Sequence, residues 1–191
     1  MNDGRAALLA MDFQNGVVAR HGDQGLKAVE RARRAIGHAR GSHAPVVYVR
    51  VAFRDGNPEV SPANRIFAPI VVGGAFAETA QATQIHAAIA PEPGDIVVTK
   101  RRVSAFTGSD LEVILRAQRV STLVLAGIAT SGVVLSTVRD AADRDYGIVV
   151  LSDACADLDP DTHRVLIEKV FPRQALVLQV EEWIQRPAGE E

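Results

Sequence analysis

Short runs of aliphatic and β-branched residues recur along the chain and alternate with longer segments whose apolar residues lie three or four positions apart. Most of the short runs are apolar nearly throughout, which predicts strands covered on both faces. The longer segments predict amphipathic helices that supply this cover. The alternation is typical of βαβ units, so we expect an α/β fold with a mainly parallel sheet of about six strands. The predicted strands are approximately Ala7–Met11, Val46–Val51, Asp95–Thr99, Leu123–Ala126, Ile148–Ser152 and Ala175–Leu178.

The helical segments have recognisable ends. The first is expected over about Gly25–Arg40. The sequence Ser109–Glu112 has the residues of a capping box, which predicts that a helix begins there with the serine hydroxyl accepting from the glutamate amide. A third helix is expected over about Gly132–Asp145, closed by Gly147 in a left-handed conformation. The pair Asp159–Pro160 predicts a fourth start, with an aspartate cap followed by proline at the first helical position.

The segment from Ala52 to Ala80 has no sustained periodicity and is rich in proline and glycine. So long a loop in a compact domain is usually functional. We expect a lid or a wall of the functional site, with an oligomer contact as a second role. No repeat or second domain is visible, and a chain of 191 residues fits a single domain over residues 1–191.

Composition excludes several classes of function. The 21 basic and 23 acidic side chains give a net charge of -2 without long blocks of either sign, so we expect no nucleic-acid partner. The apolar stretch Ala6–Met11 is too short for a signal peptide or a membrane span. The single cysteine, Cys155, allows no internal disulfide, in agreement with a reducing compartment. The expectation is a cytoplasmic protein without a membrane partner.

Polar residues at the carboxyl ends of parallel strands are the first candidates for chemistry, because ligands bind at that edge. Asp12 directly follows the first predicted strand, where burial and neighbouring charges tune the pKa of a carboxyl. A cap on a turn or helix is the alternative role for this aspartate. Lys100 follows the third strand and would hold a carboxylate ionised or polarise a substrate oxygen. A surface lysine is the alternative there.

A third candidate region is the turn after the fourth strand, which is rich in small residues from Gly127 to Gly132. Its backbone amides, at a helix N-terminus, would bind an anion or an oxyanion. An ordinary tight turn has the same composition. The glycine spacing matches neither a dinucleotide fingerprint nor a phosphate loop, so nucleotide binding is not supported.

Together these segments resemble the isochorismatase-like hydrolase superfamily, which includes nicotinamidases, other cysteine amidohydrolases and the isochorismatases. The resemblance covers nearly the whole chain and implies a three-layer α/β/α, Rossmann-like domain. Three motifs carry it in order. They are an Asp-x-Gln-Asn element at Asp12, Gln14 and Asn15, a lysine before Ser-Ala-Phe at Lys100 and Ser104 to Phe106, and a turn motif matched by Gly127, Thr130, Val134 and Thr137.

The chain departs from this family at one position. Without gaps, the nucleophilic cysteine of the cysteine hydrolases falls on Val133, and valine cannot attack a substrate. The acyl-enzyme mechanism of the family is therefore not available as written. Thr130 and Ser131 are less favoured substitutes because their side chains point in other directions. Cys155 is expected in a different loop as a buried structural thiol.

The resemblance implies a hydrolase that acts on a small molecule, with Asp12 as general acid/base and Lys100 holding its charge. Burial raises the pKa of such an aspartate and a lysine lowers it, and the sequence does not decide between them. Residues Gln14, Ala129, Thr130 and Phe106 are the expected substrate-binding or oxyanion-binding positions, although core packing explains Phe106 equally well.

The resemblance also bears on partners and cofactors. Some nicotinamidases hold zinc through an aspartate and two histidines after the second strand, whereas this chain has Asp55 there and no histidine. We therefore expect no metal and no cofactor, and we interpret the five histidines as solvated or structural. A homo-oligomer is implied. The alternative function is a non-catalytic small-molecule-binding or assembly relative, a pseudoenzyme of the cysteine hydrolases.

Overall fold

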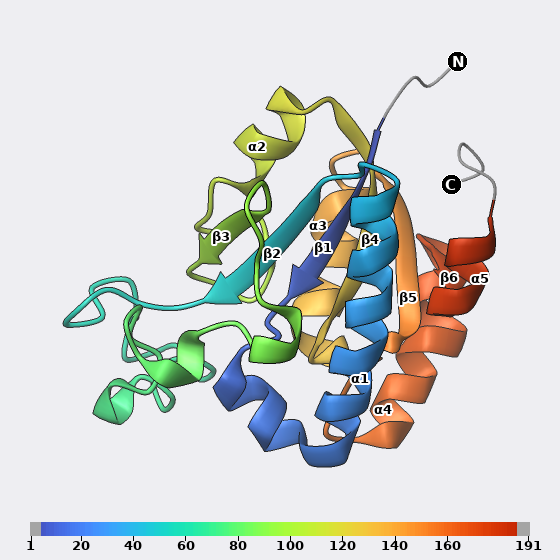
Figure 1. Cartoon of the computed structure of the whole chain (residues 1–191). Helices are drawn as coiled ribbons and strands as arrows, with labels where there is room; N and C mark the ends of the chain where they lie inside the picture. Colours follow the sequence, from blue (N-terminus) through green and yellow to red (C-terminus); the bar gives the residue numbers. More distant parts are fainter. Residues whose placement is uncertain (1–4, 187–191) are drawn as a thin grey trace.

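A computed structural model describes residues 5–186 of the chain and shows one six-stranded sheet (Figure 1). The strand order is β3-β2-β1-β4-β5-β6, and all neighbouring strands are parallel. This confirms the α/β prediction and all six strand positions within a few residues. The strands are β1 (Arg5–Met11), β2 (Val46–Val51), β3 (Ile96–Lys100), β4 (Val120–Ile128), β5 (Gly147–Ala156) and β6 (Leu176–Leu178).

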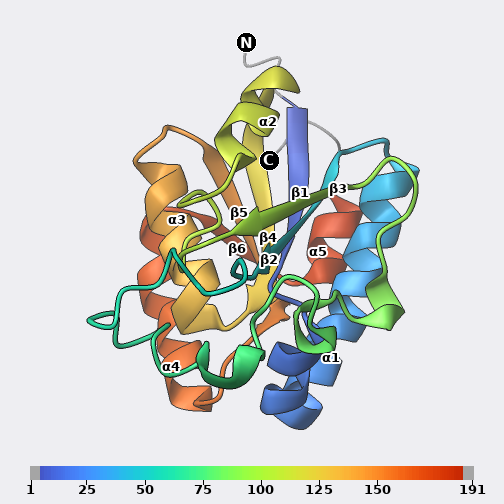
Figure 2. The same cartoon turned by 90° about the vertical axis from the view of Figure 1, so that its left-hand side faces the viewer.

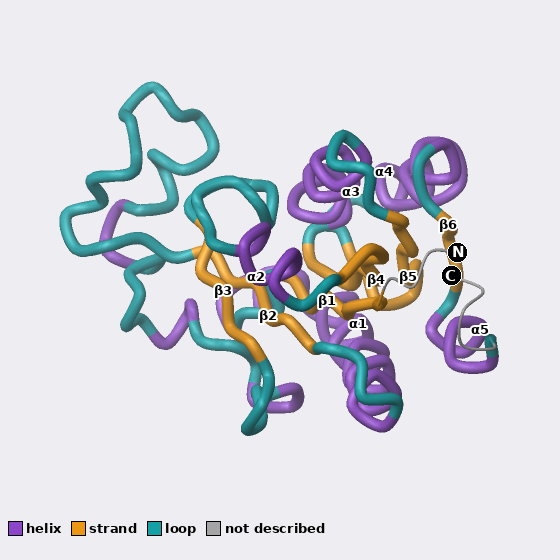
Figure 3. Tube along the Cα trace, turned by 90° about the horizontal axis from the view of Figure 1, so that it is seen from above, coloured by secondary structure: helices purple, strands orange, loops and turns teal. Residues whose placement is uncertain are grey.

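Helices cover both faces of the sheet, which gives three layers (Figures 2 and 3). On one face lie α1 (Asn15–Gly41) and α5 (Val180–Gln185), and on the other lie α2 (Leu111–Ala117), α3 (Leu135–Ala142) and α4 (Pro160–Val165). Alternate residues of each central strand enter the two cores. Leu8 and Ala10 of β1 pack with residues of α1, whereas Leu9 and Met11 pack with residues of α2 and α3.

The two central strands approach each other closely where the site begins. Met11, the last residue of β1, pairs with Gly127 of β4. A Cβ atom added at Gly127 would lie 2.9 Å from the Met11 carbonyl oxygen, so glycine is required here by space. The glycine therefore allows β4 to approach the end of β1 closely, one residue before Asp12.

Two predicted helix starts differ from the structure. The first helix begins at Asn15 rather than near Gly25, and it is kinked at Gly22, whose φ of 52° and ψ of -133° interrupt the helical pattern. The prediction of a capping box at Ser109–Glu112 is wrong. The Ser109 hydroxyl accepts from the Leu111 amide and donates to two carbonyls before it, while the Glu112 carboxylate pairs with Arg116 one turn later. The segment has the residue types of a capping box, but the Ser109 and Glu112 side chains bond to other groups instead of to each other's amides.

The helical segment after β4 begins earlier than predicted, with a wide π-type turn over Thr130–Val134 that leads into α3. The helix also ends earlier, and Asp145 rather than Gly147 takes the positive φ, at 62°. Gly147 is the first residue of β5 instead. The start of α4 is confirmed: the Asp159 side chain accepts hydrogen bonds from the amides of Asp161 and Thr162.

The long loop over residues 52–80 contains no strand and only a short 3-10 turn at Val72–Gly74, as its lack of periodicity predicted. It extends beyond the edge of the sheet formed by β3 (Figures 1 and 3). Arg101, directly after β3, anchors it by ion pairs to Glu59 and Glu78 and by a hydrogen bond to the Ala52 carbonyl. The loop is thus fastened to the strand that ends in Lys100.

Candidate functional site

Asp12 and Lys100 meet at the carboxyl edge of the sheet. Asp12 follows β1 with a φ of 55°, and its amide donates to the Val49 carbonyl of β2 at 2.8 Å. Lys100 is the last residue of β3, on the far side of β2. The lysine Nζ lies 2.8 Å from Asp12 Oδ2, and the two residues are 2% and 7% exposed. The pair spans the end of β2 and is almost closed to solvent.

The two partners of this pair differ in how well they are satisfied. The Lys100 ammonium also donates to the carbonyls of Arg102, at 3.2 Å, and Val103, at 2.8 Å, so it has three acceptors for its three protons. Asp12 Oδ1 is buried and has no hydrogen-bond partner. The surface-lysine and helix-cap alternatives are both excluded, because Lys100 is buried and the carboxylate of Asp12 pairs with it.

Burial raises the pKa of Asp12 above the ordinary value of 3.8, and the charge and hydrogen bond of Lys100 only partly oppose this. The cause is visible in the geometry, because one carboxylate oxygen has lost water without gaining a donor. The sequence left open whether burial or Lys100 dominates the pKa of Asp12, and in the structure burial has the larger effect. Asp12 retains its proton to higher pH than an exposed aspartate does.

The turn after β4 follows the strand next to β1, and part of its backbone is hydrogen-bonded within the turn. The Ile128–Ala129 peptide is cis, and the Ala129 carbonyl accepts from the amides of Gly132, at 3.1 Å, and Val134, at 3.3 Å. Val133 is 2% exposed and belongs to the same apolar cluster as Met11. Val133 is therefore a packed aliphatic side chain in the core on this face of the sheet.

Side chains of the β5–α4 segment bind Thr130 and Ser131, the two residues of the turn that follow Ala129. Thr130 is fully buried, and its hydroxyl is hydrogen-bonded to Nδ1 of His163 at 2.8 Å. The Ser131 amide donates to the Asp157 carboxylate at 2.7 Å. An amide that the sequence offered to a substrate anion is thus already occupied by a side chain of this chain. Sequence reasoning missed both partners, because neither belongs to a local motif.

Two further candidates are fully engaged inside the protein. The side chain of Gln14 is completely buried, donates to the carbonyls of Val51 and Thr83, and accepts from the Val51 amide. Phe106 is 5% exposed and stacks on Tyr146 at 5.9 Å between ring centroids. These contacts favour structural roles: Gln14 ties β1 to β2 and to the following loop, and Phe106 fills the core.

The second and third sequence motifs meet in space. The Ala105 amide donates to the Thr137 hydroxyl at 3.0 Å, and both residues are fully buried. The Ser104 hydroxyl donates to Asp140 at 2.7 Å. These bonds fix the segment after Lys100 against α3, so Ser104, Ala105 and Thr137 hold the end of β3 against the helix that follows the turn.

The expected position of Cys155 in a loop is wrong. Cys155 lies within β5, paired in register with Gly127, rather than in a loop, because β5 continues past an irregularity in its pairing with β4. The thiol is free and buried, and burial raises its pKa to about 12. It is therefore a protonated structural side chain at neutral pH, as the sequence suggested for its role.

Residues 5–186 contain no group of three or more His, Cys, Asp and Glu side chains arranged to hold a metal ion. Over the same range, no helix is both long and apolar enough to cross a membrane.

A doubly wound parallel sheet with polar residues gathered at its carboxyl edge defines a class of α/β proteins that bind ligands there. Within that class, residues 6–182 match the isochorismatase domain, so the chain belongs to the isochorismatase family, which includes hydrolases.

Individual relatives agree with this assignment. The chain is 31% identical to the isochorismatase family protein YwoC of Bacillus subtilis, over 95% of this chain and 94% of that protein. It is 29% identical to the ureidoacrylate amidohydrolase RutB of Stutzerimonas stutzeri, over 95% and 78%. Its fold matches the crystal structure of N-carbamoylsarcosine amidase from Thermoplasma acidophilum with a TM-score of 0.76 and 29% identity, over 97% of this chain and 99% of that one.

Proposed function

We propose that the protein hydrolyses a small molecule with Asp12 as general acid and without a cysteine nucleophile. The observation that carries the proposal is the buried pair of Asp12 and Lys100, in which one aspartate oxygen has no partner and the pKa of the carboxyl is raised. A carboxyl that keeps its proton to higher pH than an exposed aspartate is better able to donate it to a leaving atom. Lys100 then stabilises the carboxylate that remains.

The proposed reaction uses water directly. The proton of Asp12 passes to the leaving oxygen or nitrogen of the substrate, the bond to that atom breaks, and a water molecule adds at the carbon. The surplus proton of the water returns to Asp12, so the enzyme is unchanged and one water is consumed. Because the Lys100 ammonium lies 2.8 Å from Oδ2, the negative charge on Asp12 forms beside a fixed positive charge.

Val133 is proposed to occupy the position of the family nucleophile. A gain-of-function experiment tests this assignment: Val133→Cys keeps the site apolar and nearly isosteric, and it introduces a thiol at the position proposed for the nucleophile. We expect this variant to acquire hydrolysis of amides or ureides, the bonds named in the relatives, and to be alkylated by iodoacetamide. The matched control is Val134→Cys, its buried neighbour, which should gain neither property. Equal behaviour of the two variants would contradict the assignment.

The general-acid role is tested with the purified natural sequence. A panel of vinyl ethers, amides and ureides is screened for turnover, and Asp12→Asn and Asp12→Ala are measured with every substrate that reacts. Loss of at least a hundredfold in kcat is expected, the lower range for removal of a general acid. Turnover that survives Asp12→Ala would eliminate the mechanism.

A second candidate function is a non-catalytic, ligand-binding relative, and Val133 is the residue that favours it. The retained, buried charge pair argues against it, because a pair of this kind costs desolvation energy that a purely structural core does not need. Absence of turnover across the panel together with tight binding of one of its members would support this second function.

We further propose that the protein is a homo-oligomer and that its long loop contributes to the contact. Two large apolar residues of the loop, Ile66 and Val72, are 59% and 77% exposed. These side chains support the proposal because exposed apolar surface gains free energy when it is buried against a partner.

A further inference from the structure

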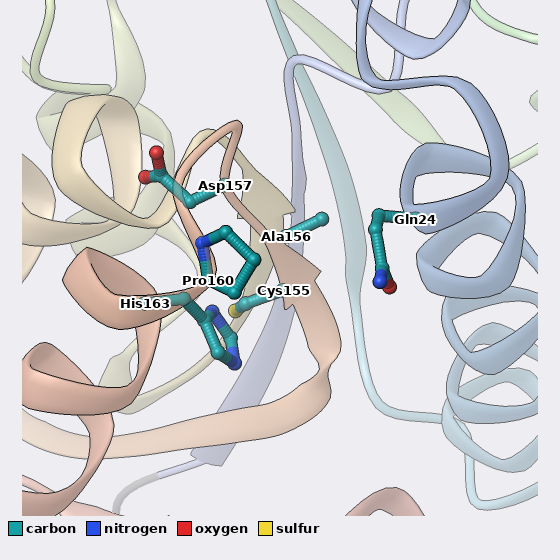
Figure 4. Close-up of a pocket in the computed structure, with 6 residues that line it drawn as sticks. All are labelled: Gln24, Cys155, Ala156, Asp157, Pro160 and His163. Atoms are coloured by element: carbon teal, nitrogen blue, oxygen red, sulfur yellow. The ribbon is translucent and has the colours of Figure 1, made fainter.

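A small cavity opens at the carboxyl end of β5 (Figure 4). In the sheet, β4 lies between β5 and β1, the strand that Asp12 follows. Its volume is about 100 Å³. Gln24 of α1 faces the other lining residues across the opening, and the ring of His163 lies beside Cys155. The lining residues are Gln24, Cys155, Ala156, Asp157, Pro160 and His163.

The strand register separates this cavity from the charged pair. Met11 pairs with Gly127, and Gly127 pairs with Cys155, so the cavity floor lies two strands from the end of β1. Adjacent strands are about 4.8 Å apart, which places Cys155 roughly 10 Å from Met11. Neither Asp12 nor Lys100 lines the cavity. The cavity is a separate site.

The cavity offers hydrogen bonds without positive charge. His163 uses Nδ1 for Thr130, and its Nε2 has no hydrogen bond to the part of the chain that the structure describes. Burial lowers the pKa of His163, which keeps the ring uncharged at neutral pH. The side-chain amide of Gln24 offers a donor and an acceptor from the other wall.

The remaining walls restrict the ligand further. The protonated thiol of Cys155 and the ring of Pro160 give an apolar surface, and the lining contains no lysine or arginine. The carboxylate of Asp157 is held by the Ser131 amide and adds negative charge. Anions are therefore disfavoured. The cavity is partly open to solvent, and its volume is below the roughly 150 Å³ of a closed cavity that accommodates benzene, so its enclosed part takes only a compact group.

We propose that this cavity is a second small-molecule site, which takes a compact, uncharged molecule with a hydrogen-bond donor and an acceptor at one end and an apolar group at the other. Two of its lining residues, Asp157 and His163, also hold Ser131 and Thr130 of the turn. A ligand bound in the cavity would therefore contact the side chains that hold the turn after β4 in place.

Acetamide and acetate provide a matched pair of probes, because they share size and shape and differ in charge. Each is titrated into the full-length, ¹⁵N-labelled protein, and amide and histidine-ring resonances are followed. Acetamide is expected to cause saturable shifts clustered at Gln24, Cys155, His163 and Thr130, whereas acetate should cause none there. Shifts that do not saturate, or equal binding of acetate, would overturn the proposal.

A variant pair tests the assignment of the walls. Gln24 is exposed, so Gln24→Ala should fold normally, and it should weaken acetamide binding about fivefold, the effect of one lost hydrogen bond. Gln185→Ala, at an exposed glutamine of α5 away from the cavity, is the control and should bind as the natural sequence does. Unchanged affinity in Gln24→Ala would also overturn the proposal, and neither result depends on the activity proposed for Asp12.

Discussion

Replacing Asp12 by asparagine should reveal which effect controls its protonation. Burial raises the pKa of Asp12 above 3.8, so the folded protein holds this proton more tightly than the unfolded chain does. The stabilising contribution is therefore complete below the unfolded pKa and is lost as the pH rises through the folded pKa. Asp12→Asn lacks this ionisation, so the natural protein should lose stability relative to the variant as the pH increases.

The size of the effect follows from the same linkage. The free energy of unfolding contributed by Asp12 falls by about 1.4 kcal/mol for each unit by which the folded pKa exceeds the unfolded one. The sign depends on geometry: Lys100 satisfies Oδ2 at 2.8 Å, whereas Oδ1 has no donor. If the lysine dominated, the folded pKa would be depressed and the sign would reverse.

Urea unfolding at a series of pH values between about 4 and 8 measures this difference, a range that begins near the pKa of an unperturbed aspartate. Fluorescence of the single tryptophan, Trp183, which is 5% exposed, follows the transition. Asp143→Asn, at an exposed aspartate, is the control and should track the natural protein at every pH. A natural protein that gains stability relative to Asp12→Asn as the pH rises would refute the reasoning.

Three other experiments test the structural framework. Gly127→Ala places a Cβ 2.9 Å from a carbonyl oxygen and should destabilise by about 1–3 kcal/mol in urea unfolding, whereas Gly37→Ala, in open space on α1, should stabilise by about 0.5–1 kcal/mol. Thr137→Val removes the acceptor of a buried backbone amide and should cost about 1–3 kcal/mol in the same assay; an unchanged midpoint would contradict that bond. Ile66→Ser with Val72→Ser should shift the molar mass measured by light scattering toward the monomer, and an unchanged mass would exclude this part of the loop from the contact.

The strands could be predicted because their signal is local. Each of the six is a short apolar run, and a run buried on both faces carries its own pattern whatever its neighbours are. Helix ends were less predictable. Ser109 has the right chemistry for a capping box, but its hydroxyl found nearer partners in the preceding carbonyls, and Gly22 bends a helix whose first turns have no clear period.

Some features of the candidate site could likewise be predicted from the sequence, and others could not. The residue types at the ends of β1 and β3 indicated that Asp12 and Lys100 would meet, and the structure brings them into contact. The roles of Gln14 and Phe106 could not be separated from the sequence, because an amide or a ring at a strand end suits a ligand and a core equally. Their partners, Val51, Thr83 and Tyr146, exist only in the folded chain.

A parallel α/β sheet with a carboxylate and an ammonium at its carboxyl edge follows from the sequence alone, since apolar runs and the residues that end them are adjacent in the chain. The hydrogen bonds that hold this edge together form only in the folded protein. Asp157 reaches the Ser131 amide from 26 residues away, and His163 reaches Thr130 from 33 residues away. The balance between burial and Lys100 at Asp12 is likewise set by water exclusion, which packing of the whole chain creates and no local pattern encodes.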